Sequence, residues 1–213
     1  DGSRSGGVRA YWKTELGGLT SSKPSFKEIK LEVNDLTAFW PVSDNLLEDA
    51  PFLAQEGSAL FAREFDFKIQ DALINGDGAG KPLGILNSAC LVTVAKETGQ
   101  AAKTIVFENI VNMYSRMYIG SRPNAVWFIN QDIEPQLDSM GLPVGAGGVP
   151  VYLPANGLSG LPYDTLYGRP VIPIEQCETL GDEGDIILAD LSEYLLIDKG
   201  PLQSALSIHV RFI

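Results

Sequence analysis

The chain has 213 residues, 45% of them hydrophobic, which is enough to bury the core of one large domain or two small ones. Its 27 Asp and Glu residues outnumber its 16 Lys and Arg residues, and this net charge of −11 argues against a protein that grips nucleic acid through phosphate contacts. No apolar run reaches about 18 residues and the N-terminal residues lack a signal-peptide pattern, so we expect no membrane partner and no sequence-specific nucleic-acid partner.

The first predicted element is a long β-hairpin. Residues 1–7 are rich in Gly and Ser and should be disordered. Strand-like runs follow at 8–12 and 25–33, and the second run alternates apolar residues with charged ones. Between them, residues 16–24 have the composition of a turn or flexible loop. These patterns predict two paired strands with a flexible tip.

Aromatic residues lie in and near this hairpin, where the arm has no core of its own. A further extended run covers 36–42, and Pro41 favours an edge position for it. Either the arm folds back onto the body of the protein or it packs on a neighbouring subunit. Because a two-stranded arm is marginally stable alone, we favour the neighbour. The predicted subunit-interface residues are Trp12, Leu19, Lys23, Phe26, Phe39 and Trp40.

The longest predicted element is a helix at 51–74. Asn45 and Glu48, just before it, have the spacing of a capping box. From there apolar residues recur every three to four positions, with charged residues between them. Such a helix would be roughly 36 Å long, and the Asn-Gly-Asp-Gly sequence at 75–78 should end it. We expect it to continue without a break at Gly57.

The rest of the chain alternates between expected helices and strands. A second helix is expected at 107–118, and a buried strand at 125–129. Asn130 should cap a short helix through 131–139. Further strands are expected at 169–175, 185–189, 194–197 and 205–213, with an irregular Gly- and Pro-rich stretch at 141–168. Helices interspersed with hairpins make the fold class α+β.

The Gly-rich sequence from Gly76 to Pro82 invites comparison with a phosphate-binding loop but does not match one. Three residues rather than four separate Gly76 from the Gly-Lys pair, and Pro82 stands where a Ser or Thr should bind magnesium. The stretch also follows a predicted helix, whereas a phosphate-binding loop follows a strand. We therefore expect no nucleotide binding here and no cofactor.

No other residue pattern points to catalysis or to a metal. Carboxylates gather at 48–49 and 178–185, at predicted element boundaries where they should be solvated. The single histidine, His209, falls in an expected strand, and no nucleophile-elbow spacing exists. Cys90 and Cys177 have neither zinc nor disulfide-framework spacing, so both are expected to be reduced and buried. We expect no catalytic, cofactor-binding or metal-binding residues.

The order of these parts resembles the major capsid proteins of tailed double-stranded DNA phages and prophages, which have the Hong Kong 97-type capsid fold. The resemblance rests on the hairpin beginning near Trp12, the Ser-Asp-Asn-Leu-Leu-Glu-Asp sequence at 43–49, and the long helix that ends in Asn-Gly-Asp-Gly. Gly-Arg-Pro-Val-Ile-Pro at 168–173 and Gly-Asp-Ile-Ile-Leu-Ala-Asp at 184–190 are similar to strands shared by that family. The resemblance to this family covers most of residues 8–198.

The resemblance implies a division into regions, with an extended loop that lies over an adjacent subunit. The regions are 1–7, disordered; 8–35, the extended β-hairpin loop; 36–103, the peripheral domain with its spine helix at 51–74; 104–198, mainly the axial domain; and 199–213, a truncated return strand. The family's N-terminal segment and last strands are not matched, so we expect both ends of the chain to be cut. Members that crosslink use a Lys on the loop and an Asn on a neighbour. Lys23 lies near the expected tip, but no Asn can be matched, so no crosslinking residue is assigned.

The function that the resemblance implies is structural, not enzymatic. The subunit would assemble with itself, as hexamers and pentamers, into the icosahedral shell that encloses phage DNA, with scaffold, protease and portal proteins as further partners. Its location would be the virion capsid, and the bacterial host cytoplasm during assembly.

Two alternatives stay open at this point. An encapsulin-like nanocompartment shell protein shares the fold and would be distinguished by a cargo pocket formed with an N-terminal helix. A carboxylate-dependent hydrolase would need two convergent, desolvated carboxylates in a deep pocket.

Overall fold

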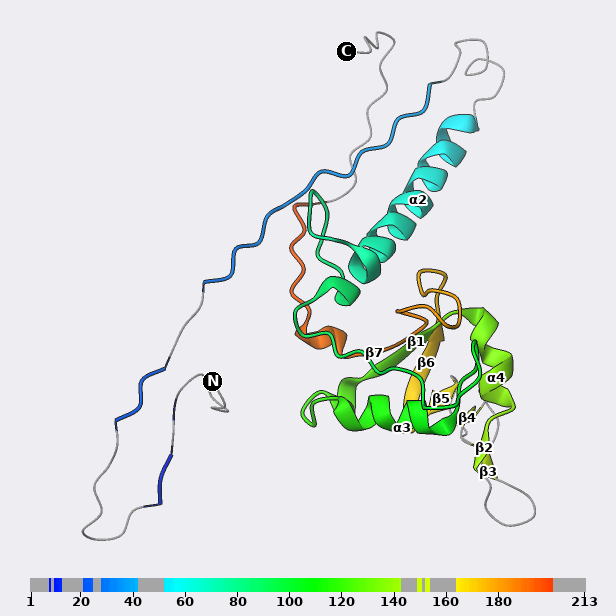
Figure 1. Ribbon diagram of the computed structural model, residues 1–213. Coiled ribbons are helices and arrows are strands. Elements are labelled where there is room, and N and C mark those ends of the chain that lie inside the picture. Colours follow the sequence, from blue (N-terminus) through cyan, green and yellow to red (C-terminus); the bar gives the residue numbers. More distant parts are fainter. Residues whose placement is uncertain are drawn as a thin grey trace. The chain divides into compact units, whose positions relative to one another are not determined.

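The computed structural model describes residues 8, 10–12, 21–24, 28–41, 52–142, 149–150, 152–153 and 164–200 (Figure 1). The chain divides into two compact units, residues 1–33 and residues 34–213. Every helix and strand of the described residues belongs to the second unit.

The described residues of the first unit form neither helix nor strand. Their large apolar side chains are exposed: Trp12 completely, Ile29 by 67% and Val8 by 51%. The strands expected at 8–12 and 25–33 are therefore absent from the described residues of the single chain, and residues 25–27 lie outside them. The hairpin stays a prediction. The extended run expected at 36–42 has no strand at its described residues either.

The predicted long helix is confirmed as α2, Leu53–Asn75, which is unbroken at Gly57 and is the longest helix of the described residues. It begins two residues later and ends one residue later than expected. Its last turn is anchored by Ile74, which is 7% exposed. Between that turn and Gly57, Leu60 and Ile69 of the expected apolar face are exposed, by 54% and 43%, and Phe61 and Phe65 are half-buried.

A five-stranded mixed sheet forms the centre of the second unit, in the order β4-β5-β6-β1-β7 (Figure 1). Strand β1 is parallel to β6, while the pairs β1–β7, β4–β5 and β5–β6 are antiparallel. The strands are β1, Val126–Ile129; β4, Tyr152–Leu153; β5, Thr165–Leu166; β6, Arg169–Pro173; and β7, Ile186–Ala189. A separate two-stranded ladder joins β2, Gly141–Leu142, to β3, Val149–Pro150.

Alternation along β1 gives the sheet two apolar faces. Trp127 and Ile129 pack in one cluster with residues of α3, Phe107–Arg116, and of α4, Glu134–Asp138. Phe128 points the other way, into a cluster with Ile74 of α2. Because β1 buries both faces, its sequence is a continuous apolar run without a polar alternate, as expected for a central strand with covered faces.

The remaining elements confirm part of the expectations. The Asn130 side chain accepts a hydrogen bond from the Asp132 N–H at 3.1 Å and so caps the short helical stretch, as predicted. The stretch begins with a 3₁₀ turn, Gln131–Ile133, and continues as α4. Three more 3₁₀ turns lie at Ile85–Asn87, Arg122–Asn124 and Leu191–Glu193.

Three expectations need correction. The second helix, α3, ends at Arg116, two residues before the expected end at 118. The Arg122 side chain donates hydrogen bonds to the carbonyls of Ser115 and Met117 at this end. The stretch 141–168 was expected to be irregular, but it contributes strands β2 to β5. These strands have two residues each, and they form through pairing with one another and with β6. Residues 194–197 carry no strand in the single chain, and 205–213 lie outside the described residues.

The two cysteines differ, which corrects the expectation that both are buried. Cys177 is 3% exposed within the second apolar cluster, and burial raises the pKa of its thiol to about 12. Cys90 is exposed in the loop after the 3₁₀ turn Ile85–Asn87, with its Sγ 2.8 Å from the Ser88 Oγ. Its loop lies outside both apolar clusters, so no surrounding layer covers the thiol.

Among the described residues, no helix has both the length and the apolar composition needed to cross a membrane.

Candidate subunit interface

Trp40, a predicted interface residue, packs on a helix of its own chain. A Cβ placed on Gly57 would lie 2.9 Å from the Trp40 ring, so the buried glycine of α2 makes room for the indole. The Trp40 and Phe61 rings meet edge to face with centroids 6.4 Å apart, and Phe65 stacks on Phe61 at 6.4 Å. Both geometries are favourable for aromatic pairs. Trp40 is still 41% exposed, so one part of its ring remains available to another molecule.

The other predicted interface residues are open to solvent where the structure describes them. Trp12 is completely exposed, Phe39 is 57% exposed and Lys23 is exposed. Leu19 and Phe26 lie outside the described residues. The structure therefore places Trp40 on α2, and the interface role of the other five residues stays a prediction.

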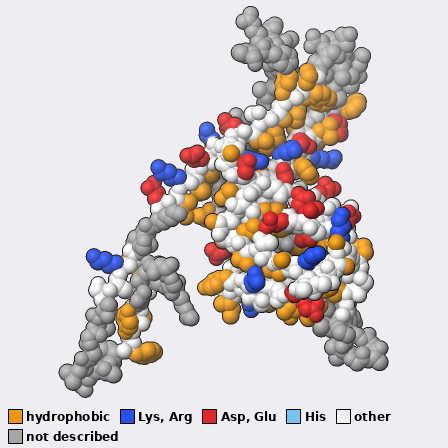
Figure 2. All heavy atoms as spheres, viewed as in Figure 1, with side chains coloured by type: hydrophobic (Ala, Val, Ile, Leu, Met, Phe, Trp, Pro, Cys, Tyr) orange, Lys and Arg blue, Asp and Glu red, His pale blue; other side chains and the backbone are white. Residues whose placement is uncertain are grey.

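The exposed face of α2 carries further apolar side chains, and we name Leu60, Phe67 and Ile69 the α2 surface. Phe67 is 39% exposed, with the Lys68 Nζ 5.8 Å from the centre of its ring. Figure 2 shows hydrophobic side chains along α2 interleaved with acidic and basic ones. This mixture of apolar anchors and a charged surround is typical of protein–protein interfaces.

Two exposed apolar groups were not among the predicted interface residues. Tyr118 and Ile119, in the turn after α3, are 75% and 74% exposed. Leu195 and Leu196, in the segment after β7, are 65% and 58% exposed. Pairs of adjacent large apolar residues, one at the end of the predicted helix 107–118 and one in the predicted strand 194–197, are the sequence signal that could have marked both groups.

Gly76 and Gly84 lie at a close crossing of two backbone segments. The Gly84 N–H donates to the Gly76 carbonyl at 2.8 Å. A Cβ on Gly76 would lie 2.1 Å from the Pro82 carbonyl oxygen, and one on Gly84 would lie 2.5 Å from the Gly76 nitrogen. Within the turn, the Ala79 N–H donates to Asp77, which lowers the pKa of that carboxyl. Only glycine fits at the crossing, so these residues have a structural reason that needs no phosphate ligand.

The carboxylates after β6 are also used by the backbone. Asp185 accepts hydrogen bonds from the N–H groups of Gly181 and Ile186, at 3.0 and 2.7 Å. Glu183 accepts one from the Thr93 hydroxyl at 2.7 Å. The described residues contain no group of three His, Cys, Asp or Glu side chains that could hold a metal ion. Residues 48–49 and His209 lie outside the described part of the chain.

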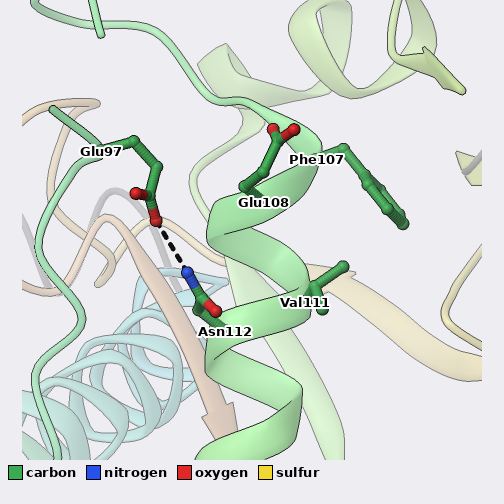
Figure 3. Close-up of a pocket in the computed structure, with 5 residues that line it drawn as sticks. All are labelled: Glu97, Phe107, Glu108, Val111 and Asn112. Atoms are coloured by element: carbon green, nitrogen blue, oxygen red, sulfur yellow. Dashed lines mark hydrogen bonds between the residues drawn. The ribbon is translucent and has the colours of Figure 1, made fainter. Parts of the chain in front are cut away.

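An open depression lies beside the first turns of α3 (Figure 3). Its lining residues are Glu97, Phe107, Glu108, Val111 and Asn112. The Asn112 Nδ2 donates to Glu97 at 2.7 Å, a contact that ties the preceding loop to the helix. The lining has no Ser, Cys or His nucleophile, and this shape does not provide the deep pocket with convergent carboxylates that a hydrolase requires.

Comparison with known proteins adds the following findings. The profile of the "Phage capsid family" matches residues 3–213. No curated protein matches the sequence. The solved structure "Capsid of native GTA particle computed with C5 symmetry" superposes with a TM-score of 0.65 at 22% identity, covering 85% of this chain and 64% of that one. "Capsid of empty GTA particle computed with C5 symmetry" gives 0.64 at 20% identity, covering 85% and 63%. The chain thus spans less than two thirds of the length of these capsid chains, and at this identity the likeness is one of fold.

Proposed function

Because the chain belongs to the phage capsid family, we propose that it is the shell-forming part of a major capsid subunit, a structural protein that assembles with its own copies into the icosahedral shell enclosing phage DNA. Hexamers and pentamers would be the building units. The family match along residues 3–213 and the likeness of fold to solved capsid chains support the proposal.

One observation within the chain carries the proposal: large apolar side chains stay exposed along a rigid helix. Leu60 and Ile69 are 54% and 43% exposed on α2, and Trp12 in the first unit is completely exposed. Scattered exposed apolar residues are normal, but several along one helix mark an interaction surface. Copies of the same subunit are the partner that a shell would supply.

The regions follow the Hong Kong 97-type arrangement in this proposal. Residues 8–35 are the extended loop that packs over an adjacent subunit, and 36–103 are the peripheral domain with α2 as its spine helix. Residues 104–198 are mainly the axial domain and 199–213 a return strand. The predicted interface residues lie in the first two of these regions, and Trp40 on Gly57 would connect the loop to the spine helix.

The proposal extends to partners and location. Scaffold, protease and portal proteins would act with the subunit, in the host cytoplasm during assembly and then in the virion capsid. The chain itself would have no enzymatic activity. The comparisons favour neither an encapsulin-like nanocompartment nor a carboxylate-dependent hydrolase.

Electron microscopy of the full-length protein, expressed alone and with its neighbouring genes, tests the proposal. We expect closed shells or rings, and light scattering should report species of several chains. Trp12→Ala should reduce assembly without changing the melting temperature, and Trp12→Phe, which keeps an aromatic ring, should retain most of it. A full-length protein that stays monomeric under every condition, with scaffold present, would refute the capsid proposal.

A further inference from the structure

Directional polar contacts between α2 and the sheet region gather at the C-terminal end of the helix. The Asn75 Nδ2 donates to the backbone carbonyl of Gln176 at 3.1 Å and to the Asp71 carboxylate, one turn back, at 3.0 Å. The Gln176 Nε2 lies 3.4 Å from the Gln70 side-chain oxygen. Gln176 is only 8% exposed, so its amide works in a site largely closed to water.

A third amide completes the arrangement. The Asn87 Nδ2 donates to the carbonyls of Asn75 and Gly76, at 3.1 and 3.0 Å. These are carbonyls at the end of α2, which a helix cannot satisfy internally. Asn87 lies on the 3₁₀ turn Ile85–Asn87, whose residues Ile85 and Leu86 pack against the second apolar cluster of the sheet. We call Asn75, Asn87 and Gln176 the amide clamp.

The apolar and polar contacts at this end of α2 have different effects on the position and on the direction of the helix. Ile74 inserts into the cluster with Phe128 and Ile187, and burial of apolar surface favours contact without favouring one direction. Amide hydrogen bonds weaken steeply when their angles are bent. The apolar plug therefore holds the end of the helix in place, while the clamp selects the direction in which the helix leaves the sheet.

Within the described residues, the middle of α2 is largely exposed. Side chains from Ser58 to Gln70 are half-buried at Phe61 and Phe65 and exposed elsewhere. Phe61 in this stretch contacts Trp40, which belongs to the segment leading into the helix and not to the sheet, whereas Gln70 at its end reaches Gln176. A helix of 23 residues held at one end is a long lever, so a small change at the clamp becomes a large displacement at Leu53.

We propose that the amide clamp sets the direction of α2 and is the joint at which α2 is reoriented when the subunit takes up different positions in a shell. The first half of this inference concerns the single chain. The second half rests on the proposed function, because only an assembly offers several positions to occupy.

Spin labels test the clamp directly. Labels at Glu56→Cys on α2 and Asp132→Cys beside the sheet, in a Cys90→Ser background, report the distribution of distances between the two elements. Cys177 is 3% exposed and should not take up label. We expect Asn87→Ala to broaden the distribution about two-fold, because the two bonds that hold the last carbonyls of α2 to the 3₁₀ turn are lost and only the bonds through Gln176 remain. Asn124→Ala, at an exposed position away from the clamp, should leave it unchanged.

A second variant separates direction from folding. Asn87→Asp keeps the shape of the side chain but removes its donor, and it should broaden the distribution as Asn87→Ala does. If either variant lowers the melting temperature while the distribution keeps its wild-type width, the clamp is only a stabilising contact and the inference is wrong. The measurement needs no assembly, so absence of shells would count against the proposed function and leave this result intact.

Discussion

Large apolar side chains are buried in the sheet and exposed on helix α2. Trp127 and Ile129 in β1 are fully buried, whereas Leu60 and Ile69 in α2 are about half exposed. Strands of the sheet have a layer on each face, and alternation places apolar residues in both layers. Helix α2 is covered at its last turn and by Trp40. If α2 is an assembly surface, as proposed, stability of the single chain and capacity for assembly reside in different parts of the sequence.

The two cysteines give the largest expected contrast. Cys90 is exposed outside the sheet core, while Cys177 is buried in it with its pKa raised to about 12. A thiol reagent at neutral pH should modify Cys90 quickly and Cys177 at least about a thousand-fold more slowly, since Cys177 has to wait for unfolding worth 5 kcal/mol or more. Mass spectrometry of timed reactions measures both rates. Comparable rates would place Cys177 outside a closed core.

Truncation of a core residue should cost far more stability than truncation on the α2 surface. Trp127 is fully buried and its Nε1 donates to the Leu166 carbonyl at 3.0 Å. Trp127→Ala should lower the free energy of unfolding by about 3–5 kcal/mol, and Phe67→Ala by less than about 1 kcal/mol, since Phe67 is partly solvated already. Urea unfolding followed by circular dichroism compares them. Equal losses in the free energy of unfolding for Trp127→Ala and Phe67→Ala would contradict the contrast between the sheet and the α2 surface.

The backbone crossing at the end of α2 should tolerate no side chain. Gly76→Ala would drive a Cβ to within 2.1 Å of the Pro82 carbonyl and should destabilise the chain by about 2 kcal/mol or more. Gly80 has no atom within 4 Å of its Cβ position, so Gly80→Ala should cost only the strain of its φ of +71°, about 1 kcal/mol. Thermal melts of both variants test the order, and a milder effect at Gly76 would contradict the crossing.

Alkaline pH should weaken the sheet region selectively. Burial raises the pKa of Cys177 from 9.0 to about 12 and also raises the pKa of Tyr152. The unfolded chain therefore loses these protons at lower pH than the folded chain does. The contribution of the two groups to the free energy of unfolding is fully present below pH 9 and is lost as the pH rises toward 12. Cys177→Ala should flatten this dependence in urea titrations between pH 8 and about pH 11. Cys90→Ala is the control, and an identical flattening there would refute the assignment.

Gly57 should show the smallest net effect, with a sign that depends on Trp40. Alanine favours a helix over glycine by about 1 kcal/mol, but its Cβ would approach the Trp40 ring at 2.9 Å. Gly57→Ala should therefore be neutral or slightly destabilising in the wild type and stabilising in a Trp40→Ala background. A double-mutant cycle by thermal melting gives the coupling. Equal effects of Gly57→Ala in both backgrounds would contradict the contact between Trp40 and Gly57.

The sequence predicted elements with strong local signals. The spacing of apolar residues located α2 within two residues, and Asn130 was assigned its cap because the capping bond spans only two positions. The strands β4 and β5 were missed, since each has two residues and exists only through pairing with a distant partner. No local pattern reports that β6 inserts between β1 and β5.

The predicted interface stays a prediction, but one contact of its residues within the chain was not expected. Trp40 was predicted to contact a neighbouring subunit, and its packing on Gly57 of α2 was not expected. The two residues belong together, because a glycine within an apolar stripe leaves a space that a distant ring can fill. The residues of the amide clamp carry no sequence signal, as side-chain amides occur throughout the chain and only the fold brings these three together.

The parallel pairing of β1 with β6 sets an order of events during synthesis. Helix α2 depends on contacts between near neighbours and can form as soon as its residues leave the ribosome, whereas β1 has to wait for β6 and β7, which are made much later. A nascent subunit therefore displays its apolar helix before its sheet is complete. Premature association of such chains would favour misassembled aggregates, and the interval of exposure ends once residue 189 has emerged and β1 can pair with both β6 and β7.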